Sequence, residues 1–177
     1  MQYISHYQSP LGDILLAADE IGLTGLWFEG QKYFALYLDQ EHEEKEVPVL
    51  EQTKKWLDVY FSGREPDFAV PFHFIGTDFQ NQVWEILAAI PYGQTTTYGE
   101  IAKQLAAKRG LKRMSAQAVG GAVGHNEISI LVPCHRVVGT NGSLTGYAGG
   151  IDKKVALLKL EGAYKEEYFV PKYSTAP

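Results

Sequence analysis

Strand-like runs of apolar residues alternate with turn residues over the first 28 positions of the chain. The runs are centred on Tyr3, on residues 14–17 and on residues 23–28, and residues rich in glycine and proline separate them. This spacing is typical of short strands joined by tight turns, so residues 1–28 are predicted to form a β-meander. Residues 49–61 then carry apolar side chains at helical spacing, and Gly63 is placed to end that helix.

Two other segments of the first half show neither strand-like nor helical periodicity. Residues 39–46 are acidic and polar, which predicts a loop or a frayed helix end. Residues 65–74 contain two prolines and few helix formers, so they are predicted to be a linker. We therefore expect an N-terminal α/β domain of residues 1–72 and a C-terminal domain of residues 73–177.

Four helices are predicted in the second half, and each starts at a residue whose side chain can accept a backbone N–H: Thr77, Thr97, Ser115 and Asp152. They extend through about residues 89, 107, 123 and 161. Gln80 and Glu100 each follow a threonine by three positions and complete capping-box signatures. The second and third helices are short, and a basic turn containing Gly110 joins them, an arrangement that resembles a helix-turn-helix.

The third of these helices has almost no side-chain bulk. Its small residues are Ala116, Ala118, Gly120, Gly121, Ala122 and Gly124. Each interior glycine costs about 1 kcal/mol relative to alanine, so the composition needs a reason. One reason is close packing against another helix, and the other is close approach of the helix backbone to a large ligand such as a DNA groove. The basic turn beside the helix favours the second.

Charge is divided unevenly along the chain. Residues 1–72 carry a net charge of −8 and residues 73–177 a net charge of +3. The basic residues of the turn region, with no acid among them, are Lys103, Lys108, Arg109, Lys112 and Arg113. Such a run is either a solvated helix end or a strip of phosphate contacts, and charge alone does not decide between them.

Composition excludes several classes of protein. The chain has 177 residues, 45% hydrophobic and 21% charged, which is enough for a sizeable core in one generous or two small domains. No apolar run approaches the ~20 residues that span a membrane, and the first residues lack the regions of a signal peptide. A single cysteine permits neither an internal disulfide nor a metal site with two thiolates. We therefore expect a cytoplasmic protein.

That cysteine, Cys134, lies in a sequence that suggests chemistry. Residues 128–132 are predicted to form a buried strand, which leads through Pro133 to Cys134 at its end. His135 could act as a general base for the thiol if a turn or a water brought the two together, and Glu161 could orient the imidazole. The alternatives are that Cys134 is a small buried hydrophobe and His135 a satisfied core histidine.

The sequence Pro-Cys-His-Arg-Val at 133–137 resembles that of the 6-O-alkylguanine-DNA alkyltransferases, also called methylated-DNA–protein-cysteine methyltransferases. Ala-Val-Gly-Gly-Ala-Val-Gly-His-Asn precedes it, and a glycine-rich stretch, Tyr147 and Leu-Leu-Lys-Leu-Glu-Gly follow it. The resemblance is close over residues 78–162 and looser before them. It implies an α/β (α+β) protein with an N-terminal ribonuclease-H-like antiparallel sheet and helix, and a helical C-terminal domain with a helix-turn-helix and an active-site loop.

The resemblance also implies a function in DNA repair by direct reversal of damage. The alkyl group of 6-O-alkylguanine would be transferred irreversibly to Cys134, once per protein molecule, after the nucleotide flips out of duplex DNA bound through its minor groove. It implies no cofactor, since the damaged base supplies the alkyl group. We expect no metal site, and nothing in the sequence requires more than a monomer. The size of the alkyl group accepted, and whether 4-O-alkylthymine is accepted, stay open.

Site residues follow from the resemblance position by position. His135, through a water, and Glu161 would activate Cys134. Asn126 matches a hinge between the recognition helix and the active site, and it could also be a helix C-cap. Tyr98 matches a tyrosine that crowds the target phosphate and can donate a proton to the leaving guanine. Substrate-binding positions are Val123, Val137, Tyr147 and Ala148. DNA-binding positions are Ser115, Ala116, Gln117, Gly120, Gly121, Arg136, Lys108, Arg109, Lys112 and Arg113.

The chain departs from the family pattern at three positions. Gln117 stands where many members have an arginine that fills the gap left by the flipped nucleotide. Glu127 stands where proline is usual, and we expect it to add an acid near the DNA side. Ala148 replaces a common serine. We expect the basic turn to add phosphate contacts that partly offset the missing arginine. A zinc site that some relatives build from two N-terminal cysteines cannot exist here.

Two other functions compete with this interpretation. A cysteine hydrolase could use Cys134, His135 and Glu161, but it would need turnover, and the features directed at DNA would have no explanation. A DNA-damage-binding sensor or regulator would transfer weakly or not at all, but the family's non-transferring sensors lack the cysteine. Repair by transfer to Cys134 therefore explains more of the sequence than either.

Overall fold

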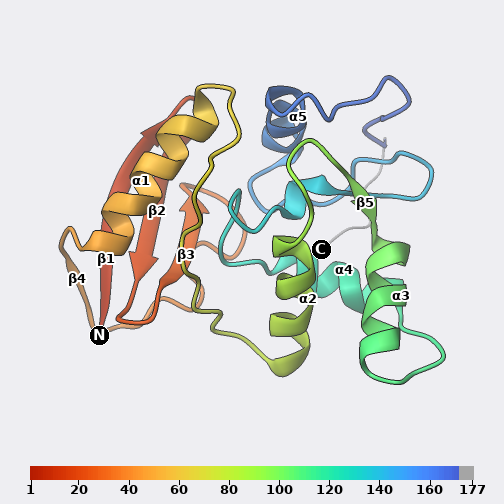
Figure 1. Cartoon of the computed structure of the whole chain (residues 1–177), viewed down its shortest axis with the longest axis horizontal. Helices are drawn as coiled ribbons and strands as arrows, with labels where there is room; N and C mark the ends of the chain where they lie inside the picture. Colours follow the sequence, from red (N-terminus) through yellow and green to blue (C-terminus); the bar gives the residue numbers. More distant parts are fainter. Residues whose placement is uncertain (172–177) are drawn as a thin grey trace. The chain divides into compact units, whose positions relative to one another are not determined.

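The computed structural model describes residues 1–171, which form two compact units (Figure 1). Met1–Ile75 and Glu127–Ser129 form unit 1. Gly76–Asn126 and the described residues from Ile130 onward form unit 2. Among the helices of the described residues, none is both long and apolar enough to cross a membrane.

Unit 1 is built on a four-stranded sheet in the order β3-β2-β1-β4. The first three strands, β1 (Gln2–Ser9), β2 (Gly12–Ala18) and β3 (Leu23–Phe28), pair antiparallel, which confirms the predicted meander. The fourth strand, β4 (His42–Glu44), pairs parallel to β1, so the expectation of a loop or helix end in this segment was wrong. Its side chains are all exposed, so no apolar alternation marks it in the sequence.

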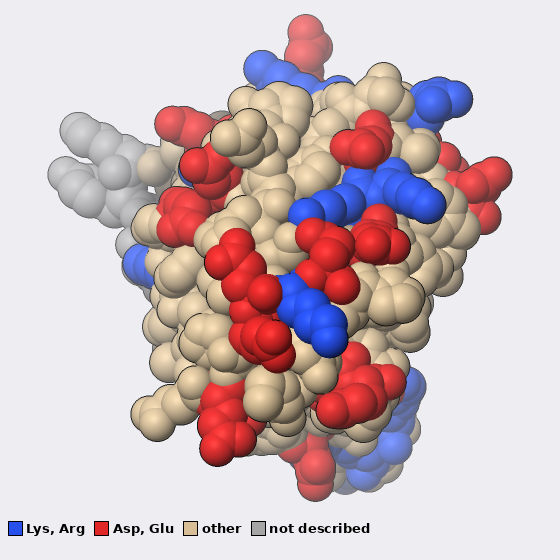
Figure 2. Space-filling view, turned by 90° about the vertical axis from the view of Figure 1, so that its left-hand side faces the viewer, with Lys and Arg blue, Asp and Glu red and all other residues tan. Residues whose placement is uncertain are grey.

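One helix, α1 (Pro48–Phe61), lies along a face of this sheet (Figure 1). Its apolar stripe of Leu50, Leu57 and Tyr60 is fully buried, as are Ile14 and Leu16 of β2. Burying each such side chain is worth roughly 1.5–3 kcal/mol, so this layer stabilises unit 1. A second buried cluster contains Leu15, Ala17 and Trp27, with Ile4, Ala35 and Leu38 packed against it. On the face seen in Figure 2, acidic side chains are more widespread than basic ones, which agrees with the net charge of −8 on the first 72 residues.

Two short segments cover the outer edge of β3. The peptide of Leu23 bonds to Pro71 and His73, with N–O distances of 2.8 Å in both directions. Farther along the strand, Leu26 accepts the Ser129 N–H at 3.1 Å and donates to the Glu127 carbonyl at 2.8 Å. An uncovered edge would leave these backbone groups unpaired, so Glu127–Ser129 completes unit 1 although its chain neighbours belong to unit 2.

Unit 2 is mainly helical. Its elements are α2 (Asp78–Ala88), β5 (Thr96–Thr97), α3 (Tyr98–Lys108), α4 (Ala116–Gly124), a 3-10 turn at Cys134–Arg136, β6 (Val137–Val138) and α5 (Ile151–Leu160). Strands β5 and β6 pair parallel. Helices α3 and α4 follow each other as a helix-turn-helix, and the Trp84 indole of α2 donates to the Ala122 carbonyl of α4 at 2.9 Å.

Three of the four predicted helix caps are present. The side chains of Thr77, Thr97 and Ser115 each accept the backbone N–H three residues on, and Thr77 forms a complete capping box with Gln80. The prediction for Asp152 was wrong, because Gly150 occupies the N-cap position of α5 with φ 99°, a conformation that glycine adopts without strain. Asp152 instead lies in the first turn, where its charge favours the helix dipole.

Candidate active site

Cys134 lies in a tight turn of buried backbone. Pro133 has φ −83° and ψ 67°, and the Cys134 N–H donates to the Val132 carbonyl at 2.8 Å, which together make an inverse γ-turn. The next three residues form the 3-10 turn Cys134–Arg136. The thiol residue is 6% exposed. Most of the residue is therefore closed to solvent.

Residues 128–132 are buried, as predicted, but the prediction that they form a strand was wrong. Only Ile128 forms a bridge, and the chain then turns, with Ile130 at φ 72°. A left-handed conformation is uncommon for a β-branched residue, and the cost is typical of a functional segment. The Val132 carbonyl accepts the Asn126 side-chain amide at 2.8 Å, so a side chain takes the place of a partner strand.

Asn126 holds the turn and the thiol together. Besides the Val132 carbonyl, its side chain hydrogen-bonds Cys134. Burial raises the pKa of the Cys134 thiol, whereas the Asn126 hydrogen bond and the charge of Lys154 lower it, and burial prevails. At neutral pH the group is therefore a thiol that needs a base. The C-cap of α4 is His125, so the alternative that Asn126 is the cap was wrong.

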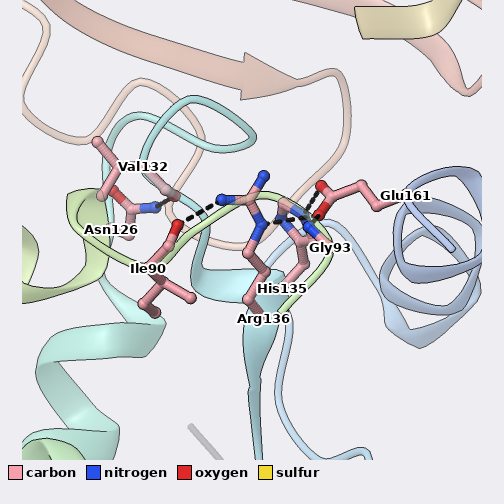
Figure 3. A network of polar contacts seen from close by, with 7 residues as sticks. All are labelled: Ile90, Gly93, Asn126, Val132, His135, Arg136 and Glu161. Atoms are coloured by element: carbon pink, nitrogen blue, oxygen red, sulfur yellow. Dashed lines mark hydrogen bonds and ion pairs between the residues drawn. The ribbon is translucent and has the colours of Figure 1, made fainter. Parts of the chain in front are cut away.

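His135 is bound to Glu161, the C-cap residue of α5 (Figure 3). The distance from His135 Nε2 to Glu161 Oε2 is 2.6 Å, and both side chains are buried. Arg136 Nε donates to the other carboxylate oxygen at 2.7 Å, and its Nη1 donates to the Ile90 carbonyl at 2.7 Å. Burial raises the pKa of Glu161, but the bonds from His135 and Arg136 outweigh it and lower that pKa to about 2. Glu161 is therefore ionised.

The protonation of His135 follows from these contacts. Burial lowers the pKa of its imidazole, against the opposing effect of Glu161, so the ring is neutral near pH 7. An ionised carboxylate only accepts, so Nε2 carries the proton and Nδ1 carries the lone pair. Nδ1 is buried and has no hydrogen-bond partner among the described residues. The site thus contains a fixed imidazole with a free basic nitrogen, one residue from a protonated thiol.

Lys154 is a buried cation of this site that sequence reasoning missed. Its ammonium donates to the carbonyls of Val137 at 2.7 Å and Thr145 at 3.2 Å. Burial lowers its pKa to about 8. The signal was present in the sequence, since Lys154 precedes Leu157 and Leu158 by three and four positions and so lies on the apolar face of α5.

Tyr98, the first residue of α3, contacts Thr145, whose carbonyl also accepts from Lys154. Its hydroxyl donates to the Thr145 carbonyl at 3.0 Å, and burial raises its pKa to about 12, so it stays protonated. Tyr147 meets the His135 ring edge-on, with centroids 6.4 Å apart. Of the other predicted pocket residues, Val137 and Val123 are buried and Ala148 is half-buried.

The predicted DNA-binding residues lie mostly on the surface of the helix-turn-helix. Those that are exposed are Lys108, Arg109, Lys112, Arg113, Ser115, Ala116 and Gln117. A Cβ built on Gly121 meets no atom within 4 Å, and one on Gly120 meets only a Tyr98 ring carbon at 3.9 Å. Internal packing therefore does not require these two glycines, whereas Ala122 is buried and its carbonyl accepts the Trp84 indole of α2.

Two charged residues do not lie where the sequence suggested. Arg136 was expected to contact DNA, but its guanidinium is buried and is used by Glu161 and Ile90. Glu127 was expected near the DNA side, but it is 3% exposed and accepts the Trp27 indole N–H at 2.7 Å within unit 1. Each side chain is held by a partner distant in sequence, which local charge patterns cannot reveal.

Comparison with known proteins agrees with the geometry, a buried thiol and an adjacent imidazole on the same unit as a helix-turn-helix. Residues 2–74 match the family model described as 6-O-methylguanine DNA methyltransferase, ribonuclease-like domain, and residues 78–163 match the model of the DNA binding domain. The chain belongs to the 6-O-methylguanine DNA methyltransferase family.

Individual relatives are similar over nearly their whole length. The methylated-DNA–protein-cysteine methyltransferase of Methanosarcina acetivorans is 45% identical over 161 residues, 91% of this chain and 99% of that protein. The protein of the same name from Haemophilus influenzae is 38% identical over 90% of this chain and 86% of that protein. A crystal structure of Mycobacterium tuberculosis OGT in complex with DNA matches with a TM-score of 0.78 and 42% identity, over 91% of this chain and 93% of that one.

Proposed function

We propose that this protein repairs DNA by transferring the alkyl group of 6-O-alkylguanine to the sulfur of its own Cys134, once and irreversibly. One observation carries the proposal: a buried thiol adjoins a neutral imidazole whose other nitrogen is fixed by an ionised carboxylate. The names of the relatives and the DNA complex of the M. tuberculosis protein support the same activity. The division into residues 1–72 and 73–177 assigns both DNA binding and transfer to the second part.

The proton moves first. Nδ1 of His135 accepts the Cys134 proton through a water, and the imidazolium that forms is stabilised by Glu161 at 2.6 Å. The thiolate then attacks the saturated carbon, an S–C bond forms, and the bond from that carbon to oxygen 6 breaks. Its electron pair leaves with the guanine, which receives a proton from Tyr98. The thioether has no easy route to hydrolysis, so the protein acts once.

The target base must also reach the thiol and be bound beside it. A base inside a duplex cannot approach a thiol that is 6% exposed, so the nucleotide must flip into the site at a cost of a few kcal/mol. Backbone groups near Cys134, Val137 and Ala148 read the guanine edge, and Tyr147 lines the pocket. Lys154 and Tyr98 both bond to the Thr145 carbonyl, which fixes the loop that carries these groups.

The exposed face of α4 enters the minor groove in this proposal. Gly121 has open space above it and a Cβ on Gly120 would touch only the Tyr98 ring, so the helix backbone can approach a groove closely. Gln117 fills the gap that the flipped nucleotide leaves. All groups of the transfer relay belong to one chain, so a monomer is sufficient for the reaction.

The intact mass of the protein tests the transfer directly. After incubation with a duplex carrying one 6-O-methylguanine, we expect a gain of one methyl group, about 14 Da, that stops at one equivalent and maps to Cys134. Cys134→Ser is expected to bind the same duplex and gain nothing. An unchanged mass with bound DNA would support a sensor instead, and an unchanged mass without binding would favour a hydrolase.

The salt dependence of DNA binding tests the basic turn. Arg109 donates to Gln82 at 2.7 Å and stacks over Phe79, so three cations of the turn are left for phosphates: Lys108, Lys112 and Arg113. Changing these three to alanine should reduce the slope of log K against log salt by about 2.7, because each phosphate contact contributes about 0.9. The control replaces three exposed cations of unit 1, Lys45, Lys55 and Arg64. An unchanged slope in the first variant would refute the contacts.

A further inference from the structure

A buried acid directly follows the residue that holds the thiol. Glu127 is 3% exposed, and its carboxylate accepts the indole N–H of Trp27, itself 1% exposed, at 2.7 Å. The two residues are 100 positions apart in the chain. An acid is almost never buried this completely without a partner, and the indole N–H is one of the donors that make the burial of Glu127 possible.

The indole is built into unit 1 for this contact. A Cβ on Gly25 would lie 2.0 Å from the Trp27 ring, so the ring lies flat over the glycine, where no other residue would leave room. Leu15 and Ala17 of β2 belong to the same buried cluster as the ring. Packing therefore fixes the direction in which the indole N–H points, and the hydrogen bond to Glu127 has one geometry.

Glu127 is held at its backbone as well as at its side chain. Its carbonyl accepts the Leu26 N–H at 2.8 Å, and its carboxylate also accepts the backbone N–H of Tyr37. Three donors of unit 1 thus fix residue 127. The peptide bond transmits this constraint to Asn126, whose side chain binds both the Val132 carbonyl and the Cys134 thiol.

We propose that Trp27 and Glu127 form a positioning pair that fixes Asn126 and, through it, holds the Cys134 thiol in the arrangement needed for transfer. This inference rests on the proposed function. The pair does not touch the reacting atoms, so its effect on transfer is through Asn126. Small displacements of a reacting group are costly: about 1 Å can reduce a rate 100-fold. The hydrogen bond therefore contributes to the rate of transfer and not to DNA binding.

The protonation of the Glu127 carboxyl group changes with pH, and this change tests the proposed positioning pair. Burial raises the pKa of Glu127 to about 7, and the N–H groups of Trp27 and Tyr37 oppose that rise. None of the groups that set this pKa is charged. A carboxylate accepts the indole N–H more strongly than a carboxylic acid does, so the pair tightens as pH rises through 7.

The test separates the effect of the Trp27–Glu127 hydrogen bond on the transfer rate from effects on folding and on DNA binding. Glu127→Met removes the acceptor and keeps the volume, and Trp27→Phe removes the donor and keeps an aromatic ring. Each is expected to lower the rate constant of methyl transfer at saturating DNA roughly tenfold, with the Kd for the duplex unchanged. The double variant should lose no more than either single one, because both remove the same bond. Glu127→Gln keeps an acceptor and is expected to restore the rate while abolishing the change between pH 6 and 8 that the pair contributes.

Trp56→Phe is the matched control, since Trp56 lies on α1 of unit 1, away from Glu127 in sequence and stacked on Tyr60. It should transfer at the wild-type rate. Wild-type rates in Trp27→Phe and Glu127→Met, or additive losses in the double variant, would overturn the positioning pair. Should Glu127→Met fail to fold, Trp27→Phe and Glu127→Gln still decide the question. Failure of the proposed function looks different, because the wild-type protein itself would then gain no methyl group.

Discussion

Replacing Glu161 with glutamine is expected to slow methyl transfer by about 10²–10³-fold. Both oxygens of this carboxylate accept from donors, His135 Nε2 at 2.6 Å and Arg136 Nε at 2.7 Å. A glutamine has one acceptor and one donor at its end, so one of the two partners must face an N–H. If that partner is His135, the ring moves its proton to Nδ1 and loses the lone pair that accepts the thiol proton.

Stability should fall in the same variant. The pKa of Glu161 is about 2 in the folded protein, below its ordinary value of 4.5, so the carboxylate stabilises the fold above pH 4.5 and this contribution is lost as pH falls toward 2. Its size is about 3 kcal/mol. Urea unfolding at pH 7 and single-turnover transfer measure the two effects, with Glu100→Gln on the surface of α3 as the control. A glutamine variant that transfers at the wild-type rate would show that His135 needs no carboxylate.

Local signals in the sequence predicted the parts of the fold that local interactions determine. Thr77 and Ser115 start helices because a side chain three residues away from a backbone N–H can bond to it whatever the rest of the chain does. The meander of residues 1–28 was predicted for the same reason, since alternation and turn residues act over a few positions. Glu161 was named from the sequence as the group that could orient His135, and the structure places the two 2.6 Å apart. The bond of Arg136 to the same carboxylate was not foreseen, because only the fold brings these residues together.

The segment before Cys134 shows where such reasoning ends. Its burial was evident from apolar residues, but a strand and an irregular buried turn have the same composition. The choice depends on Asn126, whose amide satisfies the Val132 carbonyl and lets the chain turn at Ile130. Glu127 is a similar case, because its environment is a tryptophan 100 residues earlier. The positions of both residues could be suggested by the family pattern, but their contacts could not.

Replacing Lys154 with methionine is expected to slow transfer by about 100-fold while the protein still folds. The ammonium bonds to the carbonyls of Val137 and Thr145, in the loop proposed to read the guanine. Losing it removes a buried donor from both carbonyls and leaves Thr145 with the Tyr98 hydroxyl. Its charge also lowers the pKa of Cys134, so the variant's thiol ionises less readily. Lys159→Met on the exposed side of α5 is the control and should transfer normally.

The pH dependence of stability distinguishes a buried charge from a packing role. The pKa of Lys154 is about 8 when folded and 10.5 otherwise, so the unfolded chain binds the extra proton between these values. The stability of the wild-type protein should therefore rise with pH across that window, whereas Lys154→Met lacks the rise. Between pH 7 and pH 10 the difference in unfolding free energy between the two proteins should shift by about 2 kcal/mol in favour of the wild type. A constant difference, together with normal transfer, would mean that the side chain acts only by filling space, and the Thr145 loop would then have to be held by Tyr98 alone.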